Sequence, residues 1–124
     1  MLNAILAAAL TLQSVAPMAA AAPAGPEPAP LSQENRALLR CAAGFALVAQ
    51  GQAAGDPQAK AWPDLSVRGR EFFVRAMAQL MDATGRDRAG IAALANAEAQ
   101  ALTANGEAYK VMPSCMLMLE ATRL

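Results

Sequence analysis

The two cysteines, Cys41 and Cys115, are the residues of this chain best suited to covalent chemistry, and they lie far apart in the sequence. In an exported protein such a pair typically forms a disulfide, whereas cytosolic thiols stay reduced. The chain has no Cys-x-x-Cys motif, and it has no histidine to lower a thiol pKa. A structural disulfide is therefore the leading interpretation, and two buried free thiols or a redox site are the alternatives.

Other side chains offer less for catalysis. The absence of histidine excludes histidine-dependent triads, imidazole metal sites and histidine pH switches. Methionine thioethers can bind cuprous copper, and Met77 and Met81 are spaced one helical turn apart, as are Met112 and Met116. These methionines lie among leucine and phenylalanine, which favours core packing instead. The sequence thus predicts no catalytic residue, no metal site and no cofactor.

Most carboxylates have arginine neighbours at helical spacing, which is typical of solvated helix surfaces. Glu98 is the exception, because it interrupts an apolar helical stripe. An ion pair with an arginine from a neighbouring helix would compensate its burial. The candidate partners are Arg36, Arg40 and Arg75. The chain also lacks a Gly-rich phosphate loop, a G-x-S-x-G elbow and an Asp-rich calcium loop, so we do not expect an enzyme.

The elements that must position these residues are helices. Hydrophobic residues make up 56% of the chain but aromatic residues only 4%, since alanine supplies the bulk and favours helix over strand. Capping and breaking residues predict an all-α bundle of four main helices plus one short helix, with the first and last long helices joined by the disulfide. The expected ranges are 32–50 with Gly51 as the stop, 57–61, 66–84, 87–104 and 107–122, the last interrupted or started afresh at Pro113.

Two apolar patterns add detail to this prediction. The stretch 115–119 is apolar on every side, so we expect other helices to surround it. Methionine is flexible enough to line a pocket that adapts to its guest, which makes an apolar pocket between helices a candidate site. Its expected lining is Phe72, Met77, Leu80, Met112 and Met116.

The N-terminal segment indicates export. Residues 1–21 hold a short apolar core followed by small residues, the order of a secretory signal peptide. Cleavage after Ala21 fits best, and cleavage after Ala24 or a retained segment are the alternatives. Residues 22–30 form a Pro/Ala-rich leader that we expect to be disordered, so the helical domain should span 31–124. We therefore expect a periplasmic or secreted protein with no transmembrane segment in the mature chain.

Over residues 36–121, the segments RCAAGFALVAQGQ, REFFVRAMAQLM and MPSCMLMLEA resemble a class of short exported helical proteins. These proteins carry one cysteine pair and occur in Gram-negative bacteria without an assigned function. The architecture is also similar to that of the small acid-activated periplasmic chaperones, which are exported, all-helical and held by one disulfide. This chain departs from those chaperones in its low charge density and alanine-rich helices. The resemblance implies a fold and transfers no catalytic or binding residue.

The sequence therefore favours a non-enzymatic exported interaction or structural module of the bacterial envelope, bound to a protein partner or to itself. A small hydrophobic-ligand binder and an acid-activated periplasmic chaperone are the alternatives. Ten basic and ten acidic residues cancel, so neither nucleic acid nor a membrane surface is an expected partner.

Overall fold

The computed structural model describes residues 30–124, and this part of the chain is mostly helical, without strands. Its five helices are α1 (Gln33–Ala53), α2 (Pro57–Lys60), α3 (Arg68–Thr84), α4 (Arg88–Ala104) and α5 (Met112–Ala121). The predicted all-α class is confirmed, as are the four main helices and the short one. The expected signal peptide, and all but the last residue of the expected leader, lie outside the described residues.

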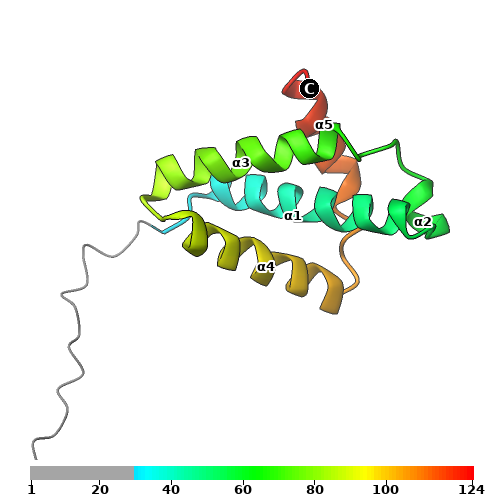
Figure 1. The fold of residues 1–124 in the computed structure, drawn as a ribbon, viewed down its shortest axis with the longest axis horizontal. Helices are drawn as coiled ribbons and strands as arrows, with labels where there is room; N and C mark the ends of the chain where they lie inside the picture. Colours follow the sequence, from blue (N-terminus) through cyan, green and yellow to red (C-terminus); the bar gives the residue numbers. More distant parts are fainter. Residues whose placement is uncertain (1–29) are drawn as a thin grey trace, which may run out of the picture.

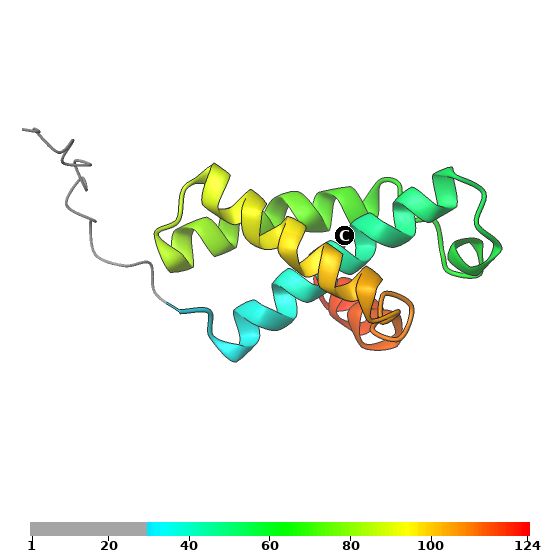
Figure 2. The ribbon, with the colours of Figure 1, turned by 90° about the horizontal axis from the view of Figure 1, so that it is seen from below.

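Helix α1 is the centre of the fold, because it contacts each of the other four helices. In the view of Figure 1, α3 lies above α1 and α4 below it, and α3 and α4 also contact each other. The view from below shows α4 crossing α1 obliquely (Figure 2). Every residue from Cys41 to Phe45 is buried, as expected for a helix that neighbours cover on several sides.

Three of the helices have a side-chain cap at their N-terminus. The side chains of Ser32, Asp56 and Asp87 accept hydrogen bonds from backbone N–H groups two or three residues further on, at 2.8–3.1 Å. These bonds satisfy donors that the first helical turn leaves without partners. Helix α3 begins two residues later than predicted. Ser66 precedes it in a turn, where the Asp64 side chain accepts a hydrogen bond from the Ser66 N–H group.

The end of α1 corrects the prediction that Gly51 stops this helix. The helix continues to Ala53, and Gly51 lies inside it. A Cβ atom at Gly51 would lie 2.8 Å from the Cβ of Ala59 on α2, closer than such atoms approach in proteins. Glycine is needed here so that α1 and α2 can pack closely. The left-handed backbone that follows α1 belongs to Gly55, at a φ of 82°.

Helix α5 corrects a second prediction. Of the two alternatives for this region, the helix starts afresh, with Pro113 in its first turn. The stretch 115–119 is not surrounded, because Leu117 is 74% exposed. Among the other four helices, α5 contacts chiefly α1 and therefore buries only one face. The buried residues of α5 are Met112, Cys115 and Leu119.

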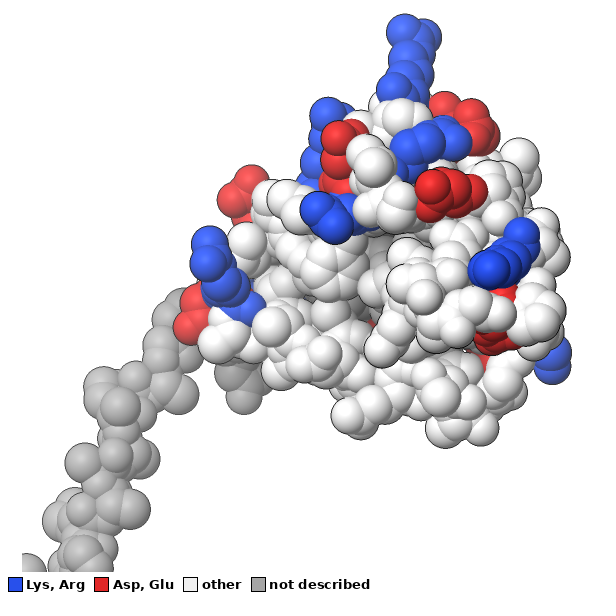
Figure 3. All heavy atoms as spheres, turned by 45° about the vertical axis from the view of Figure 1, so that its right-hand side comes forward, with Lys and Arg blue, Asp and Glu red and all other residues white. Residues whose placement is uncertain are grey.

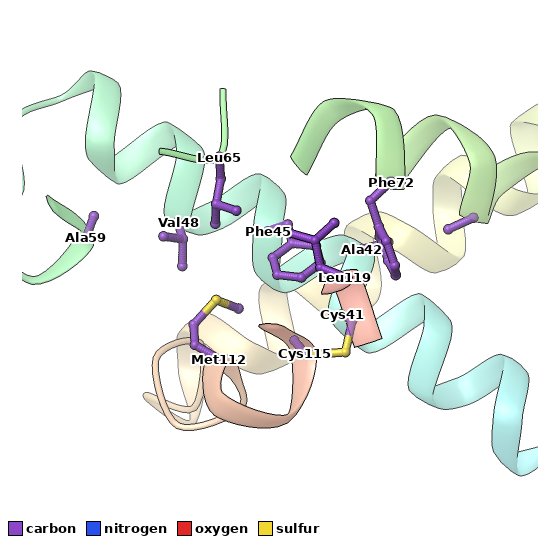
Figure 4. Close-up of a cluster of buried hydrophobic side chains, with 11 residues drawn as sticks. Cys41, Ala42, Phe45, Val48, Ala59, Leu65, Phe72, Met112, Cys115 and Leu119 are labelled. Carbon is purple, nitrogen blue, oxygen red and sulfur yellow. A yellow bond between two sulfur atoms is a disulfide. The ribbon is translucent and has the colours of Figure 1, made fainter. Parts of the chain in front are cut away.

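Buried apolar side chains form two clusters. The larger one, here called the stapled core, contains both cysteines and includes residues of α1, α2, α3 and α5 (Figure 4). Its buried members are Cys41, Ala42, Phe45, Val48, Ala59, Leu65, Phe72, Ala76, Met112, Cys115 and Leu119. The smaller one, here called the α4 core, connects α4 to α1 and α3. Its buried members are Leu39, Leu80, Ile91 and Ala95.

Candidate functional site

A groove of about 490 Å³ lies between α3 and α4. One face of each helix lines it, and α1 contributes no residue although it packs against both helices. The groove therefore opens on the side of the α3–α4 pair that faces away from α1. Its lining residues are Phe73, Val74, Met77, Ala78 and Met81 from α3, and Arg88, Ile91, Ala92, Ala95 and Asn96 from α4.

The groove is an opening into the α4 core. Ile91 and Ala95 are buried members of that core, and the half-buried side chains of Met77 and Met81 pack against it. Val74 is 60% exposed, although it is apolar. Only Arg88 and Asn96 among the lining residues are polar. A cavity of this size, apolar with a few polar groups, has the usual features of a binding site for small molecules.

The five residues of the predicted pocket do not share one cavity. Phe72 and Met112 are buried in the stapled core, with Met116 packed against it, whereas Leu80 is buried in the α4 core. Of the five, only Met77 lines the α3–α4 groove. Leu80 packs inside the α4 core and is not among the residues that line the groove.

Sequence reasoning missed most of the groove. Its α4 wall went unnoticed because that wall is built from alanine and single polar residues, which carry no strong pattern. The α3 wall left a readable signal: Phe72, Phe73, Met77, Leu80 and Met81 span a wider arc than one packed neighbour can cover. Such a broad apolar face indicates a second contact or an exposed groove.

The predicted pairing of Glu98 is absent from the ion pairs of residues 30–124. Glu98 does line a cavity of about 750 Å³ between α1 and α4, together with Arg36, Arg40 and Arg86. Arg40, however, pairs with Glu107. Both partners are partly exposed, so the pair contributes at most about 1 kcal/mol to stability. Glu98 thus shares a cavity with Arg36 and Arg40, two of its predicted partners, but it makes no ion pair with either.

The predicted disulfide between Cys41 and Cys115 is confirmed, with the two Cα atoms 5.2 Å apart. The residues are 5% and 1% exposed, so a dissolved thiol has little access to either sulfur. Figure 4 shows the bond between α1 and α5, beside Leu119. This position fits a structural link between helices that are distant in sequence.

A polar contact fixes the turn before α5. The Tyr109 hydroxyl donates a hydrogen bond to Asp56 Oδ2 at 2.8 Å, which ties this turn to the start of α2. The bond lowers the pKa of Asp56 below its usual 3.8, helped by the Gln58 N–H group. The same bond raises the pKa of Tyr109 above 10.0, since the nearby carboxylate disfavours a phenolate. The contact is structural and lies outside the α3–α4 groove.

No protein-family model, curated protein or solved structure matches this chain. Within residues 30–124, no group of three or more cysteine, aspartate or glutamate residues is placed to hold a metal ion. None of the helices described is both long and apolar enough to cross a membrane. The α3–α4 groove is therefore the candidate functional site.

Proposed function

We propose that the protein is a non-enzymatic exported binding module of the bacterial envelope, and that the α3–α4 groove receives the apolar part of its partner. The observation that carries this proposal is the groove itself, whose apolar lining is continuous with the α4 core. Covering such a lining removes apolar surface from water, which contributes roughly 25 cal/mol per Å² before the costs of association.

The two walls of the groove suit an adaptable site. The α3 wall belongs to a helix whose other face packs in the stapled core through Phe72 and Ala76, so its position is fixed. Met77 and Met81 project from this wall, and methionine changes rotamer at little cost. A fixed backbone with flexible thioether side chains allows the groove to accept apolar groups of different shapes.

The disulfide supports the exported part of the proposal. A buried disulfide in a domain of this size is typical of oxidising compartments, such as the periplasm or the extracellular space. The signal-peptide pattern of residues 1–21 points to the same compartments.

A neutral apolar dye tests the binding function directly. N-phenyl-1-naphthylamine should bind the native, oxidised protein and gain fluorescence. The variant Ala92→Phe places a ring in the groove and should abolish most of this gain. The matched control is Ala93→Phe, an exposed alanine on the same helix that does not line the groove. Equal dye binding by the two variants, or no binding by the wild type, would refute the proposal.

A further inference from the structure

We infer that the occupant of the α3–α4 groove is a free single-chain anionic amphiphile, with its chain along the methionines and its head group on Arg88. This inference rests on the proposed function and specifies its ligand. Three observations carry it: the size of the groove, the position of its one charged residue, and the absence of a carboxylate from its lining.

The size of the groove favours a small molecule over a protein partner. A standard protein–protein interface buries about 800 Å² on each partner and involves roughly 20–30 residues a side. The groove has ten lining residues and a volume of about 490 Å³. Sites for small molecules typically enclose about 300–1,000 Å³, so the groove falls within their range.

The groove has a charged end at Arg88 and an uncharged end where Phe73 and Asn96 lie. Met81 and Arg88 lie next to the short connection between the antiparallel helices α3 and α4, whereas Phe73 lies near the opposite end of the groove. Asn96 is a little over two turns from Arg88 along α4, a distance of about 12 Å. A chain anchored at Arg88 would run past Met81 and Met77 towards Phe73.

The charge of the groove favours an anion. Within the described residues, Arg88 makes no ion pair, and the neighbouring Asp87 directs its carboxylate to the Gly90 N–H group at 2.8 Å. A guanidinium presents a planar fork of donors that matches a carboxylate or a phosphate. Because no acidic residue lines the groove, an anionic head group meets attraction without repulsion from the lining.

The distribution of charge favours a free ligand over a bilayer surface. Attraction to anionic lipids requires clusters of Lys and Arg. Figure 3 shows cations and anions interspersed on the face it displays, and the whole chain has ten of each. A single arginine at the end of a narrow apolar groove suits one amphiphile molecule better than a membrane.

The test uses the protein produced from its full sequence, with its own N-terminal segment, and labelled with ¹³C at the methionine methyl groups. Decanoate below its micellar concentration is the anionic probe, and decanol is the neutral control. Decanoate should shift the Met77 and Met81 signals and leave the Met112 signal, from the stapled core, unchanged. It should bind about tenfold more tightly than decanol, the gain expected for a charge-assisted hydrogen bond.

Variants of the arginine identify the head-group contact. Arg88→Gln should reduce decanoate affinity to the level of decanol, and Arg88→Lys should restore part of the difference. Arg75→Gln is the matched control, because Arg75 is an exposed arginine of α3 that does not line the groove. It should bind decanoate like the wild type.

Each remaining outcome overturns a defined claim. If decanoate and decanol shift Met77 and Met81 with equal affinity, the groove binds apolar groups without regard to charge, and only the anionic ligand is refuted. If neither probe shifts these signals, the proposed function fails as well. If vesicles of anionic phospholipid perturb Met77 and Met81 more strongly than decanoate does, the ligand is a bilayer rather than a free amphiphile.

Discussion

The stapled core and the α4 core differ in how tightly they hold their helices. The stapled core is closed by a disulfide and contains Phe45 and Phe72 in an edge-to-face contact, with ring centroids 5.0 Å apart. The α4 core has four buried apolar members and no covalent link. Cavities flank α4 on both sides, one shared with α1 and one shared with α3. The covalent link and the aromatic contact thus belong to the stapled core, whereas the α4 core holds its helices with fewer buried apolar side chains.

This difference follows from side-chain size. Helix α4 buries only Ile91, Ala95 and Leu102, and half of its remaining residues are alanine. Small side chains fill little of the space between helices, so gaps remain on both flanks. Regions with few buried apolar contacts open more readily than densely packed ones. Binding through the α4 core would leave the stapled core undisturbed.

Removing the disulfide should destabilise the protein strongly. The Cys41–Cys115 link closes a loop of more than 70 residues. On the chain-entropy model its loss costs about 4 kcal/mol. Reduction, or the double change of Cys41 and Cys115 to alanine, should therefore lower the midpoint of thermal unfolding markedly. Calorimetry under oxidising and reducing conditions measures this, and identical midpoints would mean that the stapled core is stable without its link.

The same substitution in the two cores should have different costs. Met112 is fully buried in the stapled core, so Met112→Ala should destabilise the protein by about 2–5 kcal/mol. Met81 only packs against the α4 core from the groove, so Met81→Ala should cost about 1 kcal/mol. Chemical denaturation of the two variants measures the difference. Equal losses would show that the two regions are equally packed.

The helices were predictable because local signals specify them. Ser32, Asp56 and Asp87 are caps by virtue of their short polar side chains, and their hydrogen bonds are local. The role of Gly51 was not predictable, because the reason for this glycine is a distant neighbour, Ala59. The exposure of Leu117 likewise depends on how few helices reach α5, which no local pattern encodes.

The candidate site was less accessible to sequence reasoning than the fold. The disulfide was predicted correctly, since only two cysteines had to be paired. The pocket prediction grouped methionines by residue type, but Met77 and Met112 lie in different regions of the molecule. A groove depends on the space that side chains leave empty, and that space follows from tertiary packing.

The contact between α1 and α2 gives a smaller test of the stapled core. Gly51→Ala would place a methyl group 2.8 Å from the Cβ of Ala59, so one of the two helices must shift. Overpacking of this kind costs about 1–3 kcal/mol, partly offset by the higher helix propensity of alanine. Gln50→Ala, at an exposed position of α1, should change stability by less than about 0.5 kcal/mol. If Gly51→Ala stabilises the protein, the close contact is not real.

The smallest expected effect concerns pH and the Asp56–Tyr109 bond. Folding lowers the pKa of Asp56, so the bond contributes its full stability above pH 3.8, the pKa of the unfolded chain. This stability is lost as the pH falls through the pKa of Asp56 in the folded protein. Folding also raises the pKa of Tyr109, so the bond persists below pH 10.0 and is lost as the pH rises further. The wild type should therefore exceed Tyr109→Phe in stability by a constant amount between about pH 5 and 9.

Thermal melts of the two proteins across the pH range measure that difference. It should shrink at both extremes of pH, and a difference that grows on acidification would contradict the assignment. An acid-activated chaperone would in addition bind more apolar dye at pH 3 than at pH 7.

Native mass spectrometry of the protein purified from its own host tests the central claim, that the α3–α4 groove is the binding site. We predict that the wild type carries a bound small amphiphile, that Ala93→Phe retains it, and that Ala92→Phe loses it because the new ring fills the groove. A wild-type protein that carries nothing, or an Ala92→Phe variant that carries the same species as the wild type, would contradict the account.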